Sequence, residues 1–316
     1  MARALLFYCD GDDGQLRDAL REALRKVDPT LEFRVWPEAG ERKDIVYAAV
    51  WIPPDELFDD LSSLEAVFAL SAGVDLLLAN PALPDCGPVV RLEDAGMAES
   101  MAEYVLFGVL HAHRGLPHYT EAQRARRWSP RASLLAASDF RVGILGSGVL
   151  GHKVATRLRD NGYAVSCWSR RPHSMTAGIE HVNGPDALLP LAARCNVLVC
   201  LLPLTYATRG ILDRRVFDAM PQGGFLINAA RGEHLIDDDL LEAIQQGKLS
   251  GALLDVMHEE PAPESHPFWD EARIVITPHV SAPTQAHAAA VQTSQALAAM
   301  LEGTPPPGLV DRISGY

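Results

Sequence analysis

The sequence has little cysteine, no long apolar run and a shortage of positive charge. The cysteines are odd in number, scattered and without a C-x-x-C pair, which favours reduced thiols in a cytoplasmic protein over a disulfide framework; they are Cys9, Cys86, Cys167, Cys195 and Cys200. No run approaches the roughly 18 apolar residues of a membrane span, and the first apolar run is too short for a signal peptide. With 28 basic against 41 acidic residues, the net charge of −13 argues against nucleic acids and anionic membranes as partners.

The composition that remains is that of a globular protein, with 48% hydrophobic and 22% charged residues. A chain of 316 residues is long enough for two domains, each with a core of its own. The acidic balance does not exclude small anionic ligands, because these need only a local cluster of basic side chains.

Strand-like apolar runs alternate with amphipathic stretches along nearly the whole chain. Helices are predicted over residues 14–27, 149–161, 237–247 and 284–302, and a longer helical pattern covers 97–127, where Pro117 should end or kink it. Eleven runs read as strands: ALLFYC, LEFRVW, IVYAAVW, AVFAL, PVVRL, FRVGILG, YAVSCWS, NVLVCLL, GFLINAA, GALLDV and RIVITP. Apolar strands separated by helices indicate parallel sheets buried on both faces, and eleven strands are more than one such sheet holds comfortably. We therefore expect an α/β protein with two doubly wound parallel-sheet domains.

A glycine-rich loop follows one of these strands. The segment GSGVLG places Gly146, Gly148 and Gly151 in a G-x-G-x-x-G pattern between the strand RVGIL and a predicted helix. A bare glycine pattern is weak evidence, but a strand before it, a helix after it and a second strand end about 20 residues later are typical of a dinucleotide site. The amides of Val149 and Leu150 would then bind a pyrophosphate at the helix N-terminus.

The end of the next strand lacks the acid that an NAD site uses to bind the ribose 2′-hydroxyl. Ser169 stands at that position, and Arg170 and Arg171 follow it. A carboxylate repels the 2′-phosphate of NADP, whereas a guanidinium binds it as a fork. The sequence therefore predicts NADP(H) as cofactor, with a pair of solvated surface arginines as the alternative.

Several further segments complete a recognisable set: SAGVD at 71–75, LINAARGEHLID, GALLDVMHEEPAP, IVITPHVSAPT and the ending VDRISGY. Together with GSGVLG, CWSR and DAGMAESMAEYVL, they resemble the D-isomer-specific 2-hydroxyacid dehydrogenases, and within that family the bacterial glyoxylate/hydroxypyruvate reductase A group. The chain departs from the family pattern at the missing ribose-binding acid and at Ser71, where glycine is commoner.

The resemblance implies a domain order and a set of site residues. A flavodoxin-like substrate domain would comprise residues 1–100 and the return helix and tail 284–316, around a Rossmann cofactor domain at 101–283. Arg231 would bind substrate, Glu260 would be the acid partner of His279, and His279 would be the catalytic acid/base. Further residues would lie along the cofactor: Leu202, Pro203, Thr208, Ala229 and Asp255, the last at the nicotinamide carboxamide. For Thr208 a helix cap is an equally simple explanation.

The implied roles agree with the chemistry of reducing a 2-keto acid. Arg231, Asp255 and His279 each come at or just past the end of a predicted strand, and the carboxyl ends of parallel strands share the edge where ligands bind. A guanidinium can bind a carboxylate or polarise a carbonyl, and a histidine beside an acid can deliver the proton. No metal is expected, because the cofactor supplies the reducing power.

The substrate side is predicted from two other strand ends. The Ala72 and Gly73 amides could bind the substrate carboxylate, and Trp51 could wall a pocket for small substrates or, as an alternative, lie at a domain interface. We expect NADPH-dependent reduction of glyoxylate and hydroxypyruvate. A 2-keto acid reductase of broader specificity is the alternative enzyme, and a nucleotide-sensing partner protein of the same fold is the alternative of another class. The family further implies a homodimer, with the helical region 97–127 and the segment through Trp128 as its contact.

Overall fold

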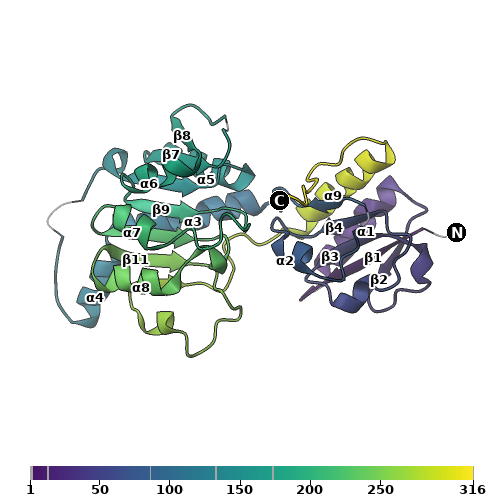
Figure 1. Cartoon of the computed structure of the whole chain (residues 1–316), viewed down its shortest axis with the longest axis horizontal. Coiled ribbons are helices and arrows are strands. Elements are labelled where there is room, and N and C mark those ends of the chain that lie inside the picture. The colour runs from purple at the N-terminus through teal and green to yellow at the C-terminus, as the bar shows by residue number, and fades with distance from the viewer. Residues whose placement is uncertain (1–2, 13, 86, 132–133, 173, 316) are drawn as a thin grey trace. The chain divides into compact units, whose positions relative to one another are not determined.

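The strands of the computed structural model lie in two separate parallel sheets (Figure 1). The structure describes residues 3–12, 14–85, 87–131, 134–172 and 174–315. The chain divides into two compact units: unit 1 is Met1–Met97 with Thr284–Tyr316, and unit 2 is Ala98–Pro283.

Unit 1 holds a five-stranded sheet in the order β2-β1-β3-β4-β5, with every pair parallel. This is the flavodoxin-like order 2-1-3-4-5. Its elements are β1 (Ala4–Cys9), α1 (Gln15–Val27), β2 (Glu32–Val35), β3 (Ile45–Trp51), β4 (Ala66–Ala69), α2 (Asp75–Ala79), β5 (Val89–Arg91) and α9 (Ala286–Leu301).

Side chains that alternate along each strand of unit 1 build a core on both faces of the sheet. Leu5 and Phe7 of β1 pack with α1 and α9, whereas Leu6 packs on the opposite face with Leu57 and Phe58. Because both faces are covered, the inner strands β3 and β4 consist of apolar residues throughout, whereas the edge strand β2 contains Glu32 and Arg34.

Unit 2 holds a seven-stranded parallel sheet in the order β12-β11-β10-β9-β6-β7-β8. This is the Rossmann order with one further strand, and the chain crosses over between β6 and β9. Its elements are α3 (Met97–His113), which begins at the unit boundary, α4 (Leu116–Arg124), β6 (Arg141–Leu145), α5 (Val149–Asp160), β7 (Ala164–Ser169), β8 (Ile179–Asn183), α6 (Leu188–Ala192), β9 (Val197–Cys200), α7 (Arg214–Ala219), β10 (Gly224–Asn228), α8 (Asp237–Gln245), β11 (Leu249–Leu254) and β12 (Ile274–Ile276).

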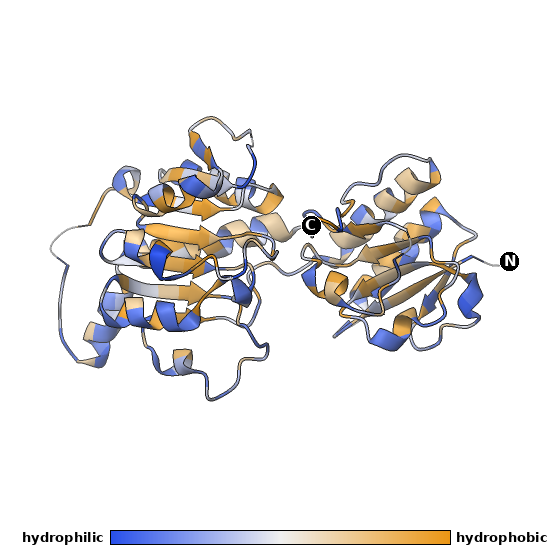
Figure 2. Cartoon of the chain, viewed as in Figure 1, coloured by the Kyte–Doolittle hydropathy of each residue, from blue (hydrophilic) through white to orange (hydrophobic). Residues whose placement is uncertain are grey.

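Helices cover both faces of this sheet as well. Val197 and Val199 of β9 point to the face that α3 and α5 cover, and Leu198 and Cys200 point to the face that α6, α7 and α8 cover. Figure 2 shows apolar strands inside each unit and helices whose colour changes from apolar to polar around their circumference. The sheet is thus covered on both faces, which leaves its carboxyl edge as the place for a ligand.

The predicted α/β class and the two doubly wound parallel sheets are confirmed, as are the four shorter helices. One strand was missed, and one prediction on local structure is wrong. Strand β8 was not predicted, because IEHVN is too polar to stand out as a buried run. The long helical pattern is broken by Gly115, which adopts a left-handed φ of 72°, and Pro117 lies in the first turn of the next helix instead of ending the first one.

Two sequence features complete the description of the fold. Among the described residues, no helix combines the length and the apolar character needed to cross a membrane. Cys9, Cys167, Cys195 and Cys200 are free thiols, as predicted, and Cys86 lies outside the described residues.

Candidate active site

The glycine-rich loop joins β6 to α5 at the carboxyl edge of the unit 2 sheet. Gly146 has a left-handed φ of 114°, and a Cβ there would lie 2.7 Å from the carbonyl oxygen of Leu201. A Cβ on Gly151 would overlap the carbonyl of Gly146. These two glycines therefore serve the tight turn and the close packing of helix on strand.

Gly148, the middle glycine, is needed neither for the tight turn nor for the packing of helix on strand. A Cβ built on it would meet nothing within 4 Å, so the loop is open above its backbone. Beside it, the hydroxyl oxygen of Ser147 is buried and has no hydrogen-bond partner among the described residues. An open backbone, an orphan hydroxyl and the exposed first residue of α5, Val149, fit a ligand with anionic oxygens.

The structure places Ser169 as the last residue of β7, followed by the exposed Arg170 and Arg171. The Ser169 hydroxyl donates to the carbonyl oxygen of Arg171 at 2.5 Å and lies 2.9 Å from Nε2 of His181 on β8. His181 was missed by sequence reasoning, because its strand was not predicted and its register with β7 was therefore unknown. Ser169, Arg170 and Arg171, the three residues at this strand end, are polar or basic, and none of them is an acid.

Arg231, Glu260 and His279 come from three segments that meet at the same edge of the sheet. Nδ1 of His279 lies 2.8 Å from Oε2 of Glu260, whose Oε1 accepts a hydrogen bond from the Met257 amide at 3.0 Å. Burial opposes ionisation of Glu260, but its hydrogen bonds to His279 and Met257, together with the positive charge of Arg231, outweigh that effect and lower its pKa below the ordinary value. Glu260 is thus held as a carboxylate beside the imidazole.

Gly232 explains how the arginine segment comes so near to the acid segment. A Cβ on Gly232 would overlap the backbone of Met257, so the two loops touch through their main chains. This contact ties the backbone next to Arg231 to the residue whose amide holds Glu260.

The backbone of His279 is in a left-handed conformation with φ 54°. That conformation costs a non-glycine residue about 1–2 kcal/mol. It is stabilised by the buried Asp255, whose carbonyl accepts from the His279 amide at 2.8 Å. Its carboxylate accepts from the amides of Val280 and Ser281, each at 2.9 Å. The turn wraps its amides around a carboxylate, as in other anion-binding turns.

On the unit 1 sheet, Trp51 is the last residue of β3 and is 40% exposed. Ala72 and Gly73 lie in the turn after β4, which Ser71 closes by donating from its hydroxyl to the Gly73 carbonyl at 2.7 Å. Serine in place of the commoner glycine therefore supplies a bond that stabilises the turn.

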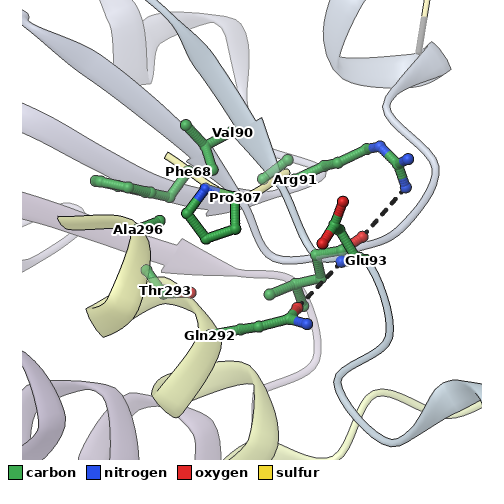
Figure 3. Close-up of a pocket in the computed structure, with 10 residues that line it drawn as sticks. Phe68, Val90, Arg91, Glu93, Gln292, Thr293, Ala296 and Pro307 are labelled. Carbon is green, nitrogen blue, oxygen red and sulfur yellow. Dashed lines mark hydrogen bonds between the residues drawn. The ribbon is translucent and has the colours of Figure 1, made fainter. Parts of the chain in front are cut away.

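Arg91, at the end of β5, was not predicted as a site residue. Its Nη1 donates to the carbonyl oxygens of Ala72 and Leu92, both at 3.4 Å. Figure 3 shows its guanidinium pointing away from the small cavity beside Phe68 and Ala296. A basic residue that closes a predicted strand, as in PVVRL, is a signal that could have indicated it.

Comparison with known proteins decides the family. Residues 106–281, more than half of the chain, match the model of the "D-isomer specific 2-hydroxyacid dehydrogenase, NAD binding domain". The chain belongs to the D-isomer specific 2-hydroxyacid dehydrogenase family. The matched stretch lies within unit 2 and contains the glycine loop, Arg231, Glu260 and His279.

Solved structures of this family resemble the whole chain. A D-isomer specific 2-hydroxyacid dehydrogenase from Xanthobacter autotrophicus Py2, in complex with NADPH and MES, is 35% identical over 100% of both chains, with a TM-score of 0.91. An NADPH-dependent glyoxylate/hydroxypyruvate reductase from Sinorhizobium meliloti, in complex with NADP and sulfate, is 32% identical over 99% of this chain and 100% of its own, with a TM-score of 0.89. A probable 2-hydroxyacid dehydrogenase from Rhizobium etli CFN 42, in complex with NADP, HEPES and L(+)-tartaric acid, is 29% identical over 99% of both chains, with a TM-score of 0.85.

Two buried residues support the arginine loop. The Asn228 side chain donates to the Arg231 carbonyl at 2.9 Å, and the ring of His234 lies between the carbonyls of Arg231, at 3.2 Å, and Pro203, at 3.3 Å. Burial lowers the pKa of His234 more than its two carbonyl partners raise it. His234 stands inside the ARGEHLID segment, yet no role was predicted for it, because its function depends on contacts that the sequence does not show.

The remaining predicted cofactor residues line the ends of β9 and β10. Leu202 is buried and Pro203 exposed just past β9, and the Ala229 amide just past β10 donates to the Cys200 carbonyl at 3.3 Å. The Thr208 hydroxyl donates to the Pro203 carbonyl at 2.7 Å and accepts from the Thr205 amide at 2.8 Å. Thr208 therefore closes a turn, and it is not the helix cap that was the alternative for it.

Proposed function

We propose that this dehydrogenase uses NADPH to reduce small 2-keto acids, with glyoxylate giving glycolate and hydroxypyruvate giving D-glycerate. The observation that carries the proposal is the 2.8 Å hydrogen bond between His279 and Glu260 beside Arg231, on the same sheet edge as an open glycine loop. Unit 2 would be the cofactor domain and unit 1 the substrate domain.

The residues of unit 2 suit NADP(H). The backbone of Gly148, Val149 and Leu150 would hold the pyrophosphate, and Ser169 with Arg170 and Arg171 would bind the 2′-phosphate. Leu202, Pro203, Thr208 and Ala229 would border the bound cofactor. Asp255 would take the nicotinamide carboxamide on an oxygen that also supports the His279 turn. The cofactor, when bound, supplies the hydride. The complexes of related dehydrogenases with NADPH or NADP support this choice.

The substrate would be held by its carboxylate and its keto oxygen. Arg231 offers a planar fork of donors that can bind either oxygen and polarise the carbonyl. Ala72 and Gly73 would give backbone amides to the carboxylate, and Trp51 would limit the size of the side chain that fits. Because a guanidinium stabilises the developing alkoxide more than the ground-state carbonyl, Arg231 would lower the barrier as well as bind.

His279 would give a proton to the carbonyl oxygen as it becomes the hydroxyl of the product. The imidazolium is left neutral, and a proton from solvent restores it. Glu260 favours the charged ring and fixes its orientation through the bond to Nδ1, which leaves Nε2 free to face the substrate. The net reaction consumes one keto acid, one NADPH and one proton.

Initial rates of NADPH oxidation with a panel of 2-keto acids test the proposal. We expect turnover with glyoxylate and hydroxypyruvate, and a loss of about 10²–10⁴-fold in His279→Ala. His287→Ala, which removes an exposed histidine of α9, is the matched control. Equal rates with bulkier keto acids would favour the reductase of broader specificity. NADPH binding without turnover of any keto acid would favour a nucleotide-sensing protein and refute the proposal.

We also propose a cytoplasmic homodimer. Trp128 is 99% exposed, and the helical region before it exposes Phe107, Leu110 and Leu116. An apolar surface of this kind favours a partner of the same chain. Light scattering of the wild type and of Trp128→Ala measures the mass, and a monomeric wild type would contradict the proposal.

A further inference from the structure

A half-buried tyrosine ends a chain of hydrogen bonds that leads to the turn of His279. The hydroxyl of Tyr104, on α3, lies 2.6 Å from Oγ1 of Thr277, and that oxygen lies 2.7 Å from Oδ1 of Asp255. Asp255 in turn holds the amides of Val280 and Ser281. The chain thus begins on a helix and ends at the two residues that follow His279.

The direction of these bonds follows from the groups themselves. An ionised carboxylate only accepts hydrogen bonds, so Thr277 must donate its one hydroxyl proton to Asp255. Its oxygen can then only accept from Tyr104, which must be the donor. Burial, and to a lesser degree the negative charge of Asp255, raise the pKa of Tyr104, so that it keeps its proton throughout the working pH range.

The turn needs this support because His279 is strained. Thr277 lies two residues before His279, and its carbonyl accepts from the His279 amide at 3.0 Å. Without the hydrogen bond from the Thr277 hydroxyl, one carboxylate oxygen of Asp255 would lose a partner and the left-handed turn could relax. A small rotation of the turn would lengthen the bond from Nδ1 of His279 to Glu260.

We propose that Tyr104 and Thr277 are positioning residues for His279, acting through Asp255. The inference rests on the proposed function, because it assigns the chain a purpose only if His279 moves the proton. Neither residue touches the substrate in this scheme. Their effect is on how well the imidazole is aimed and on how firmly it stays paired with Glu260.

Three substitutions test the hydroxyls and not the packing. Thr277→Val keeps the branched shape and removes the hydroxyl, Thr277→Ser restores the hydroxyl, and Tyr104→Phe keeps the ring. Tyr163→Phe is the matched control, because Tyr163 is a buried tyrosine of the same unit whose hydroxyl bonds to His113 at 3.1 Å. Each variant is assayed for kcat, for KM with glyoxylate, for the pH profile of reduction, for NADPH affinity and for thermal unfolding.

We expect Thr277→Val to lose about 10- to 100-fold in kcat and Tyr104→Phe about 3- to 10-fold, the sizes of one charge-assisted and one neutral hydrogen bond. KM for glyoxylate should change by less than about threefold, because Arg231 still anchors the substrate. In Thr277→Val the pH at which reduction fails should fall, since a loosened imidazole is less well paired with Glu260. Thr277→Ser should restore both the rate and the profile.

Three results would overturn the inference. They are a wild-type kcat and pH profile in Thr277→Val, an equal loss in Thr277→Val and Thr277→Ser, and a loss in Tyr163→Phe as large as that in Tyr104→Phe. These outcomes are separate from failure of the proposed function, which would show as no turnover of any keto acid by the wild type or as full activity in His279→Ala. If Thr277→Val does not fold, the comparison of Tyr104→Phe with Tyr163→Phe still decides.

Discussion

Replacing Gly148 by alanine should weaken cofactor binding and leave the fold intact. The added methyl meets nothing of the protein within 4 Å, and the backbone angles of φ −71° and ψ −166° suit alanine. Alanine lowers the conformational entropy of the unfolded chain, which stabilises the folded state by about 0.4–1 kcal/mol. Alanine is also a poorer N-cap than glycine, which offsets this gain by a similar amount. The free energy of unfolding should therefore change by less than about 1 kcal/mol.

The same methyl would stand where the pyrophosphate must approach the loop. Keeping the anion at a distance costs at least one charge-assisted hydrogen bond, about 1.5–3 kcal/mol, which corresponds to an NADPH affinity roughly 10- to 100-fold weaker. Gly151→Ala is the contrasting variant, because its Cβ would overlap the Gly146 carbonyl. Strain of that kind costs about 1–3 kcal/mol and should lower the melting temperature by several degrees.

Two measurements separate these effects. Titration of NADPH followed by its fluorescence gives the dissociation constant, and thermal unfolding without cofactor gives the stability. Wild-type affinity in Gly148→Ala would refute the placement of the pyrophosphate at this loop. Wild-type stability in Gly151→Ala would refute the packing argument for the third glycine.

Three further predictions concern the cofactor strand end and the catalytic residues. Arg170→Gln should weaken NADPH by about 10- to 100-fold and leave NADH nearly unchanged in the same titration, and a wild type that uses both cofactors equally well would contradict the assignment. In Glu260→Gln, reduction should fail at a lower pH. The lowered pKa of Glu260 keeps this side chain ionised in the wild type, and the neutral glutamine no longer favours the protonated ring of His279. An unchanged pH–rate profile would remove Glu260 from the mechanism. Arg231→Lys should raise KM and lower kcat, since a point charge replaces the fork, and it should lose most of the preference for a keto acid over the matching aldehyde. Equal discrimination in both forms would show that Arg231 is not the carboxylate anchor.

The sequence predicts the fold well where strands are apolar on both faces. Strands such as IVYAAVW and NVLVCLL could be read directly, because burial by helices on both sides demands apolar residues throughout. The edge strand β8, IEHVN, could not, since it combines exposed polar residues with a single buried one, Ile179. The helix break at Gly115 was also missed, because the sequence does not show which of two nearby helix breakers adopts the unusual backbone.

In the site, residues that form a local sequence pattern could be predicted, whereas residues that act through contacts distant in the sequence could not. The glycine loop and the paired arginines could be predicted, because each is a local pattern with a local physical reason. Asn228, His234 and Tyr104 could not, since each acts through a hydrogen bond to a residue whose position depends on the folded sheet. Of the two carboxylates that were predicted, Glu260 and Asp255, the second has a further part in the structure as the anchor of a strained turn.

The positions of the arginines explain how a chain with a net negative charge would bind the proposed anionic ligands. Arg91 closes β5, Arg170 follows the last residue of β7, and Arg231 lies three residues past β10. Each is therefore at or just beyond the carboxyl end of a parallel strand, where the loops of a doubly wound sheet gather around ligands. By contrast, Arg214 pairs with Glu242 and Arg273 with Glu271, away from these strand ends. A net charge of −13 thus repels extended polyanions, while a few guanidiniums at strand ends can still bind a phosphate or a single carboxylate.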